Sequence, residues 1–290
     1  MRFRFIDAER VGLAMPASRL CKLLQVSVSG YYAWRNRSPS QRQLDDMVLL
    51  AHVRAAFRCS RETYGAERVH HELAGNGVEI GRHRVARLMR ENGLSPKRKQ
   101  KFKKTTDSQH NKAVASNLLD QDFSAEAPNR KWAADISYIW TAQGWLYLAV
   151  ILDLYSRRVI GWAAGARITS DLPRRALNRA IALRQPGAGV IHHSDRGSQY
   201  CSDAYQARLG ELGFLVSMSG KGNCYDNAVV ETFFKTIKSE LIWRTVFMSR
   251  SHAETAIAEY IDGFYNPERR HSTLAFTSPV KFEAEAMQTE

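Results

Sequence analysis

The hydrophobic positions of the first third of the chain recur at helical spacing. Between Ser18 and Trp34, apolar side chains interrupt a polar background, and Ser27 stands where a second helix would begin. Serine is a favoured N-cap because its side-chain oxygen accepts a hydrogen bond from an early backbone N–H of the helix. The pattern predicts two short helices joined at Val26–Ser27, either as a small helix-turn-helix or as an ordinary helical hairpin.

Three further helices are predicted after a polar linker from Arg35 to Gln43. Their ranges are 44–57, 66–74 and 82–92, and in the last of these Gly81 is the N-cap and Gly93 the stop. The surface of the last helix is rich in arginine, with Arg82, Arg84, Arg87 and Arg90. Because Arg bonds both phosphates and guanine edges, this helix is typical of DNA recognition, with a merely solvated face as the alternative.

The pattern changes to strands after Pro128. Strand-like stretches are followed by alternating helices and strands, at 131–140, 145–154, 157–163, 171–184 (helix), 190–192, 203–212 (helix), 214–218, 227–243 (helix) and 252–264 (helix). A three-strand meander followed by this alternation predicts an α/β fold with a mixed sheet and flanking helices, as in an RNase H-like domain. We therefore expect four segments: a helix-turn-helix segment with its linker at 1–43, a helix-turn-helix-like DNA-binding domain at 44–95, a linker at 96–127 and a catalytic domain at 128–290.

Charge is distributed unevenly between these segments. Residues 1–112 hold 23 Lys and Arg against 10 Asp and Glu, whereas residues 113–290 hold 19 of each, so the whole excess of +13 lies in the front part. Such asymmetry indicates a polyanion-binding front half joined to a module of another purpose. No apolar run approaches the roughly 18 to 20 residues of a membrane span, and an acid at Asp7 argues against a signal peptide, so we expect a cytoplasmic protein without membrane contact.

The densest run of cations follows Pro96. Six cations stand within eight residues, namely Lys97, Arg98, Lys99, Lys101, Lys103 and Lys104. Such a run repels itself and stays extended until it meets phosphate, so we expect a linker that lies along DNA. A disordered, solubilising tether is the alternative.

Three carboxylates of the back half stand beside apolar or small residues in segments that are expected to be structured. Asp135 falls within a predicted strand, Asp195 just past the fourth strand, and Glu231 on a predicted helix. A carboxylate near a core needs an ion pair, hydrogen bonds or a metal ion, so the three together predict a cation-binding centre. His192 and His193 lie next to it, but Mg²⁺ prefers oxygen to imidazole, which favours a structural or DNA-orienting role for both. The four cysteines show no C-x-x-C pair and are expected to be reduced packing residues.

The helix that carries Glu231 also carries cations on the same side. Asn227, Glu231, Lys235 and Lys238 follow one another at i, i+4, i+8 and i+11. Glu231 and Lys238 therefore share a face, about 10.5 Å apart along the helix axis. This arrangement lets an acid at the metal and a cation at a phosphate address one DNA strand, although a solvated face would explain Lys238 as well.

Three motifs together resemble a known signature. They are Trp132-Ala-Ala-Asp135-Ile-Ser-Tyr138, His193-Ser-Asp195-Arg196-Gly-Ser-Gln-Tyr200, and Asp226-Asn-Ala-Val-Val-Glu231 followed by Lys238, with 35 residues between Asp195 and Glu231. The chain is similar to the DDE and retroviral-integrase superfamily, and more narrowly to the second-frame transposases of the insertion-sequence three family, from about Leu13 to about Phe282. Ser137 stands where Thr is commoner, and Gly81 where a hydroxyl cap is usual.

The resemblance implies a DDE-type polynucleotidyl transferase that cuts and joins the ends of an insertion element. Asp135, Asp195 and Glu231 would be catalytic and would bind two Mg²⁺ or Mn²⁺ ions, while Asn227, Lys235, Lys238 and Arg196 would contact DNA. The implied partners are the terminal inverted repeats, target DNA, a first-frame protein or fusion partner, and further copies of the chain on DNA. Two alternatives stay open, an RNase H-like nuclease that does not join and a DNA-binding regulator without catalysis.

Overall fold

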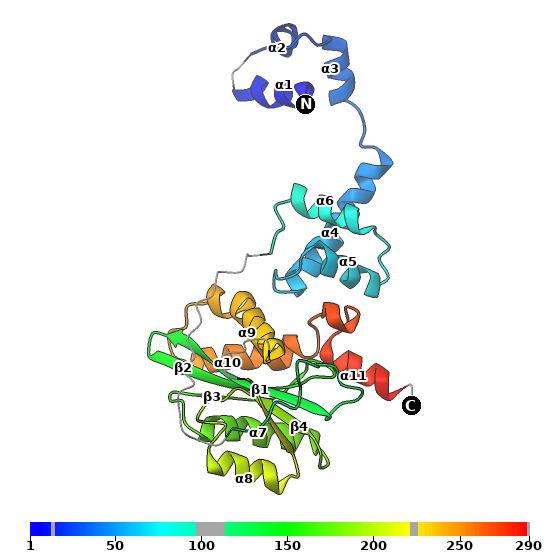
Figure 1. Ribbon diagram of the computed structural model, residues 1–290. Coiled ribbons are helices and arrows are strands. Elements are labelled where there is room, and N and C mark those ends of the chain that lie inside the picture. The colour runs from blue at the N-terminus through cyan, green and yellow to red at the C-terminus, as the bar shows by residue number, and fades with distance from the viewer. Residues whose placement is uncertain (13–14, 97–113, 221–225, 289–290) are drawn as a thin grey trace.

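The computed structural model describes residues 1–12, 15–96, 114–220 and 226–288 (Figure 1). The chain passes from a small helical unit, through a second helical unit, to a mixed sheet covered by helices on both faces. The expected basic linker from Lys97 to Lys104 lies outside the described residues. Among the described residues, no helix is both long enough and apolar enough to cross a membrane.

The first unit contains α1 (Arg2–Gly12), α2 (Ala17–Leu23) and α3 (Val28–Arg35). The two predicted helices and their junction are confirmed, because Ser27 caps α3 by accepting a hydrogen bond from the Gly30 backbone N–H at 3.1 Å. Helix α1 was not predicted, since the alternation of Arg and Phe at its start does not have helical spacing. Its conformation is fixed by packing, because Ile6 is buried against Leu20 and Tyr31 of the other two helices.

The second unit contains α4 (Gln41–Cys59), α5 (Ala66–Gly75) and α6 (Arg82–Glu91). All three were predicted, but α4 begins three residues before the expected start. The reason is a capping box, in which the Ser40 backbone N–H donates to Oε1 of Gln43 at 2.7 Å. Val53, Phe57, Val69, Leu73 and Val85 form the buried centre of this unit.

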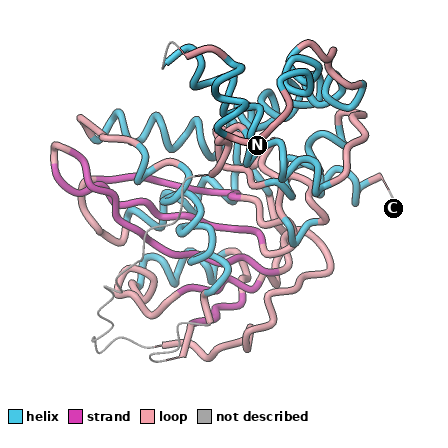
Figure 2. The backbone as a smooth tube through the Cα atoms, turned by 90° about the horizontal axis from the view of Figure 1, so that it is seen from above, coloured by secondary structure: helices cyan, strands magenta, loops and turns pink. Residues whose placement is uncertain are grey.

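The mixed sheet predicted from the back half is confirmed. Its five described strands lie in the order β3-β2-β1-β4-β5, which Figure 2 shows side by side. The pairs β1·β2 and β2·β3 are antiparallel, whereas β1·β4 and β4·β5 are parallel. The strands are β1 (Lys131–Thr141), β2 (Gly144–Asp153), β3 (Val159–Gly165), β4 (Ile191–Ser194) and β5 (Leu215–Met218).

Helices cover both faces of the sheet because the strands carry apolar side chains on both faces. In β2, Ala149 and Ile151 pack toward α7 (Asp171–Arg184) and α8 (Asp203–Glu211). Leu148, Val150 and Leu152 pack toward α9 (Ala228–Glu240) and α10 (Arg250–Tyr260). Helix α7 lies so close to β3 that a Cβ at Gly161 would collide with the Ala176 carbonyl oxygen.

The C-terminal helices differ from the predicted ranges. The helix predicted to reach Trp243 ends at Glu240 and gives way to a short 3₁₀ turn, η1 (Ile242–Arg244), so its predicted end was wrong. The helix predicted over 252–264 is α10, which continues as a π-helical turn, η2 (Ile261–Tyr265). A 3₁₀ turn, η3 (Ser272–Leu274), and helix α11 (Pro279–Met287) follow and were not predicted.

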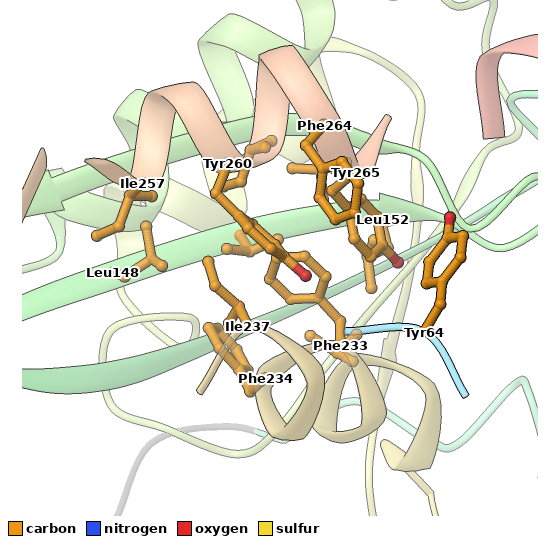
Figure 3. Close-up of a cluster of buried hydrophobic side chains, with 14 of the residues drawn as sticks. Tyr64, Leu148, Leu152, Phe233, Phe234, Ile237, Ile257, Tyr260, Phe264 and Tyr265 are labelled. Carbon is orange, nitrogen blue, oxygen red and sulfur yellow. The ribbon is translucent and has the colours of Figure 1, made fainter. Parts of the chain in front are cut away.

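The second helical unit packs directly on these C-terminal helices. Tyr64 lies beside Tyr265 and Leu152 in the shared core (Figure 3), and its hydroxyl accepts a hydrogen bond from the Arg270 backbone N–H at 2.7 Å. The Arg270 guanidinium donates to Oε2 of Glu72 at 2.6 Å. The expected DNA-binding unit and the expected catalytic domain therefore form one continuous core.

Candidate active site and DNA-binding surfaces

Asp135 lies in the middle of β1, the central strand of the sheet. Its Oδ1 accepts a hydrogen bond from the Ile136 backbone N–H at 2.7 Å. Burial raises the pKa of Asp135 well above its ordinary value, and the charges of Asp195 and Glu231 raise it further. The expected mid-strand position is confirmed, and the three carboxylates are close enough to repel one another.

Asp195 follows the last residue of β4, as predicted. The parallel register pairs Ala134 of β1 with Ser194 of β4, so Asp135 and Asp195 each stand one residue beyond the same pair on adjacent strands. Oδ1 of Asp195 accepts a hydrogen bond from the Gly197 backbone N–H at 2.9 Å, which holds the turn after the strand. A Cβ at Gly197 would stand 2.9 Å from that oxygen, so a larger residue here would displace the Asp195 carboxylate.

Glu231 reaches the same region from the first turn of α9. Asn227, the residue before this helix, donates through Nδ2 to the Ala134 carbonyl oxygen at 3.3 Å and so ties the start of α9 to β1 beside Asp135. Glu231 pairs with Lys235, with 3.3 Å between Oε2 and Nζ. The helical position of Glu231 is confirmed, and three separate elements supply the three acids.

The donor set has the chemistry that a hard divalent cation requires. Burial raises the pKa of Asp135 and the charges of the two other carboxylates raise it further, so a cation among the three would relieve both the burial penalty and the repulsion. In the described residues, however, no group of three or more His, Cys, Asp or Glu side chains is already arranged to hold a metal ion. The acids bond to their own neighbours, Ile136, Gly197 and Lys235. A cation-binding centre formed by these three acids stays a prediction.

Lys238 shares a helix face with Glu231 as expected, but it is buried. Only 6% of the residue is exposed, and Nζ lies over the Tyr138 ring at 5.1 Å from its centroid. Burial lowers the pKa of Lys238, while the charge of Asp135 raises it. The side chain lines a cavity of about 470 Å³ whose walls include Trp140 and Trp145.

Several predicted DNA contacts occupy positions that the sequence pattern did not indicate. Asn227 is only 6% exposed and bonds to β1, and its contact with DNA stays a prediction. Lys235 is exposed beside Glu231, and Nε of Arg196 donates to the Ser219 carbonyl oxygen. His192 and His193 are buried and hydrogen-bond to Tyr205 and to Ser217 and Ser219, which agrees with a structural role.

The arginines of α6 fall into two pairs. Arg84 and Arg87 both reach Asp46 of α4, each with a nitrogen at 2.7 Å from a carboxylate oxygen, and they lower the pKa of Asp46. Arg82 and Arg90 are exposed. A helical-wheel argument placed all four on the outer surface, but it could not identify Asp46 as a partner because that residue is 38 positions away from Arg84.

Tyr200 and Asp226 near the site were not singled out from the sequence. The Tyr200 hydroxyl is buried with no hydrogen-bond partner among the described residues, and the charges of Asp135 and Asp195 help to raise its pKa. Oδ2 of Asp226 accepts from the Gly220 backbone N–H at 2.7 Å, and the residue is buried directly before α9. Their place in the same motifs as Asp195 and Glu231 was the available signal.

Comparison with known families and relatives assigns both halves of the chain. Residues 125–224 and 212–279 match two families described as integrase core domain, and residues 43–102 match a family described as HTH-like domain. An insertion element IS600 31 kDa protein of Shigella sonnei is 47% identical over 263 residues, which cover 91% of this chain and 97% of that protein. The transposase InsF for insertion sequence IS3A of Escherichia coli K12 is 42% identical over 290 residues, with 98% of each chain covered.

Two solved structures are also matched. A chain of the simian T-cell lymphotropic virus intasome in complex with the PP2A regulatory subunit B56 gamma is matched with a TM-score of 0.46 and 18% identity over 61% of this chain and 60% of the other. The HTLV-2 integrase catalytic core domain, solved with magnesium, is matched with a TM-score of 0.41 and 16% identity over 55% of this chain and 98% of the other.

Proposed function

This chain belongs to the IS3 family of DDE-type DNA transposases, and on that premise we propose that Asp135, Asp195 and Glu231 are the residues with which it cuts and joins DNA. The observation that carries the proposal is the parallel register of β1 and β4. This register sets Asp135 beside Asp195. The charge of Glu231, like that of Asp195, contributes to the raised pKa of Asp135. Carboxylates that repel one another in this way are suited to binding cations.

The chemistry needs an oxygen nucleophile aligned with a phosphodiester. Two divalent ions, Mg²⁺ or Mn²⁺, when bound by the three carboxylates and the reacting phosphate, would stabilise the attacking and leaving oxygens. Asp135, Asp195 and Glu231 would hold the ions through their carboxylate oxygens. Water attack would leave a 3′-hydroxyl at the end of the element, and attack by that hydroxyl on target DNA would join the strands, with no covalent bond to the protein.

The protein's own residues would prepare this arrangement. Asn227 fixes the start of α9 on β1, which sets the distance of Glu231 from the two aspartates. Lys235 pairs with Glu231 and would have to release it to a cation.

A strand-transfer assay tests the proposal against its rivals. Purified protein is incubated with labelled ends of the encoding element and a target duplex, with and without Mg²⁺ and with and without the first-frame protein. Joined product supports a transposase, whereas cleavage without joining indicates a nuclease. Cation-independent binding without cleavage indicates a regulator. Joining only when the first-frame protein is present would make it a required partner, and synapsis of two ends implies at least a dimer.

We expect Lys238 to position the terminal DNA rather than to take part in bond making. Lys238→Ala should lower the yield of correctly placed cuts about 10-fold, because a nucleotide that enters the Trp140–Trp145 cavity loses its charged partner. Lys238→Arg retains the charge and should retain more activity than Lys238→Ala. Cleavage kinetics across a Mg²⁺ titration check this expectation. A large rightward shift of the metal requirement in Lys238→Ala, with intact end binding, would instead mean that the lysine supports the metal site through Asp135.

We also expect the arginines of α6 to read the element's ends. Arg84→Ala and Arg87→Ala should weaken binding to the specific end by about 10- to 100-fold, which is the range expected when one base is no longer read, and binding to random DNA much less. Replacing Lys99, Lys101 and Lys103 together should weaken both alike and lower the salt dependence of binding. Fluorescence anisotropy on specific and random duplexes measures the difference.

Asp46→Asn is the matched control for this expectation, because it removes the shared partner of both arginines without changing either of them. If Arg84 and Arg87 act on DNA, Asp46→Asn should bind the end at least as well as the unmodified chain. A loss in Asp46→Asn equal to that in the arginine variants would assign the pair to the packing of α6 on α4.

A further inference from the structure

A second cavity lies on the other side of α9, between the second helical unit and the catalytic domain. Its volume is about 570 Å³, and its walls include Thr63 and Arg68 from the helical unit, Pro96, and residues of α9, η1 and η3. The residues of α9 that line it include Ala228, Thr232, Thr236 and Ser239, whereas Glu231, Lys235 and Lys238 do not line it. Helix α9 therefore separates this cavity from the candidate active site.

Arginine dominates the charge of this cavity. Arg68, Arg157, Arg244 and Arg269 line it, and Glu240 is the one carboxylate among the described lining residues. Glu240 is already engaged, because Arg269 donates to both of its oxygens at 2.7 and 2.8 Å and the Tyr260 hydroxyl donates at 2.7 Å. Burial and the neighbouring arginines lower the pKa of His271, so the histidine adds no charge at neutral pH. With Arg269 paired to Glu240, the guanidinium groups of Arg68, Arg157 and Arg244 remain in excess.

Within the described part of the chain, none of these three has a close carboxylate partner of its own. The Arg244 side chain donates to the carbonyl oxygens of Ser239 and Arg61, at 2.9 and 3.2 Å. Arg68 stands 3.9 Å from Oε1 of Glu240, the limit for an ion pair, behind the two bonds from Arg269. Nη1 of Arg157 is buried without a hydrogen-bond partner among the described residues. The three side chains are partly exposed, but a buried guanidinium nitrogen without a partner, such as Nη1 of Arg157, is costly, and an anion beside it would offset that cost.

The backbone at Arg157, a residue that lines the cavity, is strained. Its φ is +60°, in the left-handed region that residues with a Cβ rarely adopt. The Tyr265 hydroxyl donates to the Arg157 carbonyl oxygen at 3.1 Å and holds this conformation. Burial lowers the pKa of Arg157, which marks a cation poorly compensated by its surroundings. The fold therefore maintains a strained turn that keeps a guanidinium in the cavity.

We propose that this cavity binds phosphate groups of the DNA backbone next to the strand that is cut. Guanidinium groups recognise phosphate through paired N–H donors, and hydroxyl groups of Thr63, Thr232, Ser272 and Thr273 in the walls supply further donors. Polynucleotide fits better than free phosphate because the HTH-like unit and the catalytic domain both contribute walls. Pro96, which immediately precedes the cation-rich residues 97–104, lines the cavity as well.

The location of the cavity predicts which phosphate it holds. An α-helix with its side chains is about 10 to 12 Å across, and duplex DNA rises about 3.4 Å per nucleotide of one strand. A phosphate on the far side of α9 from Glu231 therefore lies roughly three nucleotides from the scissile bond. The inference rests on the proposed function, because it assumes that the cut strand lies at Glu231.

The test is the salt dependence of DNA binding by the full chain, measured in EDTA so that no strand is cut. With a duplex of the element's end, Arg157→Gln and Arg244→Gln should each lower affinity. The double variant should reduce the slope of log affinity against log salt by about 0.9 for each phosphate that the cavity no longer neutralises. Arg208→Gln is the control, because that exposed arginine on α8 pairs with Glu211 and lies outside the cavity. Thermal unfolding confirms that the variants are folded.

Methylphosphonate substitution gives the position. Neutralising single phosphates two to four nucleotides from the cleavage position should weaken binding by the unmodified chain at one of them, and Arg157→Gln should be insensitive to that substitution. Unchanged slopes in folded variants overturn the proposal. A second result would also overturn it: inorganic phosphate raises the Tm of the unmodified chain but not that of Arg157→Gln, while the salt slopes of DNA binding are the same for both. The cavity would then bind free phosphate and not DNA. If the slopes fall as expected but the unmodified chain never joins DNA, the proposed function fails while the phosphate site stands.

Discussion

Asp135→Asn, Asp195→Asn and Glu231→Gln should each abolish both cleavage and joining of DNA while the chain stays folded and bound to element ends. A neutral amide keeps the shape of each side chain but removes the negative charge that holds a divalent cation. We expect a loss of more than about 10³-fold, beyond the roughly 10- to 100-fold cost of removing a residue that only supports a metal ligand. End binding should persist because the basic front half, which carries the whole excess of positive charge, is expected to supply most of the phosphate contacts.

The pKa of Asp135 gives this prediction a second readout. A carboxyl group whose pKa is raised on folding destabilises the folded state at neutral pH, so Asp135→Asn should not lower Tm in EDTA. Mg²⁺ should raise Tm of the unmodified chain and have little effect on the variant.

Asp203→Asn is the matched control, because Asp203 is an exposed acid in the first turn of α8 and should be neutral in both assays. Near-normal strand transfer by any of the three acid variants would remove that residue from the site. A fall in Tm equal to the loss of activity would mean that the residue is structural.

Arg184→Met should lower the free energy of unfolding by about 3 to 5 kcal/mol. Arg184 is 7% exposed at its side chain and joins two buried carboxylates, Glu283 of α11 and Asp153 at the end of β2. The Ser156 hydroxyl and Arg158 also donate to Glu283. Methionine fills similar space but leaves the carboxylates with too little positive charge, and removing one partner of a buried ion pair typically costs this much.

Urea unfolding of the full chain measures this effect, with Arg208→Met as the control. The Arg208–Glu211 pair is exposed on α8, with side-chain exposures of 38% and 62%, and its loss should cost less than about 1 kcal/mol. Equal midpoints for the two variants would mean that the buried network contributes little. If Arg184→Met is strongly destabilised, combining it with Glu283→Gln should recover part of the loss, because the second change removes one uncompensated charge.

Hydrophobic spacing predicted most of the elements because each depends mainly on residues near in sequence. The exact range of α7, the start of α6 at Arg82 and the Ser27 cap all follow from side chains within a few positions of one another. The predicted range was wrong where the end of a helix depends on a contact with a distant segment. Helix α9 stops at Glu240, the point where Glu240 turns into the interior to meet Arg269 from a segment 29 residues away.

In the candidate site, too, the sequence predicted features that depend on nearby residues and missed those that depend on distant ones. The sequence indicated the family, because three motifs with fixed spacing resemble its signature, and the same motifs predict Asp135, Asp195 and Glu231 as the acids of the site. It could not show that Lys238 is buried against Tyr138, that Asn227 bonds to β1, or that Arg84 and Arg87 share Asp46. Each of those facts depends on a partner from another element, and helical periodicity says only which residues share a face.

The sequence by itself thus determined the order of most elements, the α/β class and the basic front half, and it predicted the three acids. Only the tertiary structure decided the parallel register that sets Asp135 beside Asp195, the joining of the helical unit to the catalytic domain, and the arginine-lined cavity between them. The physical reason is range. Capping and periodicity act over a few residues, whereas strand pairing and the balance of buried charge depend on contacts between segments tens to hundreds of residues apart.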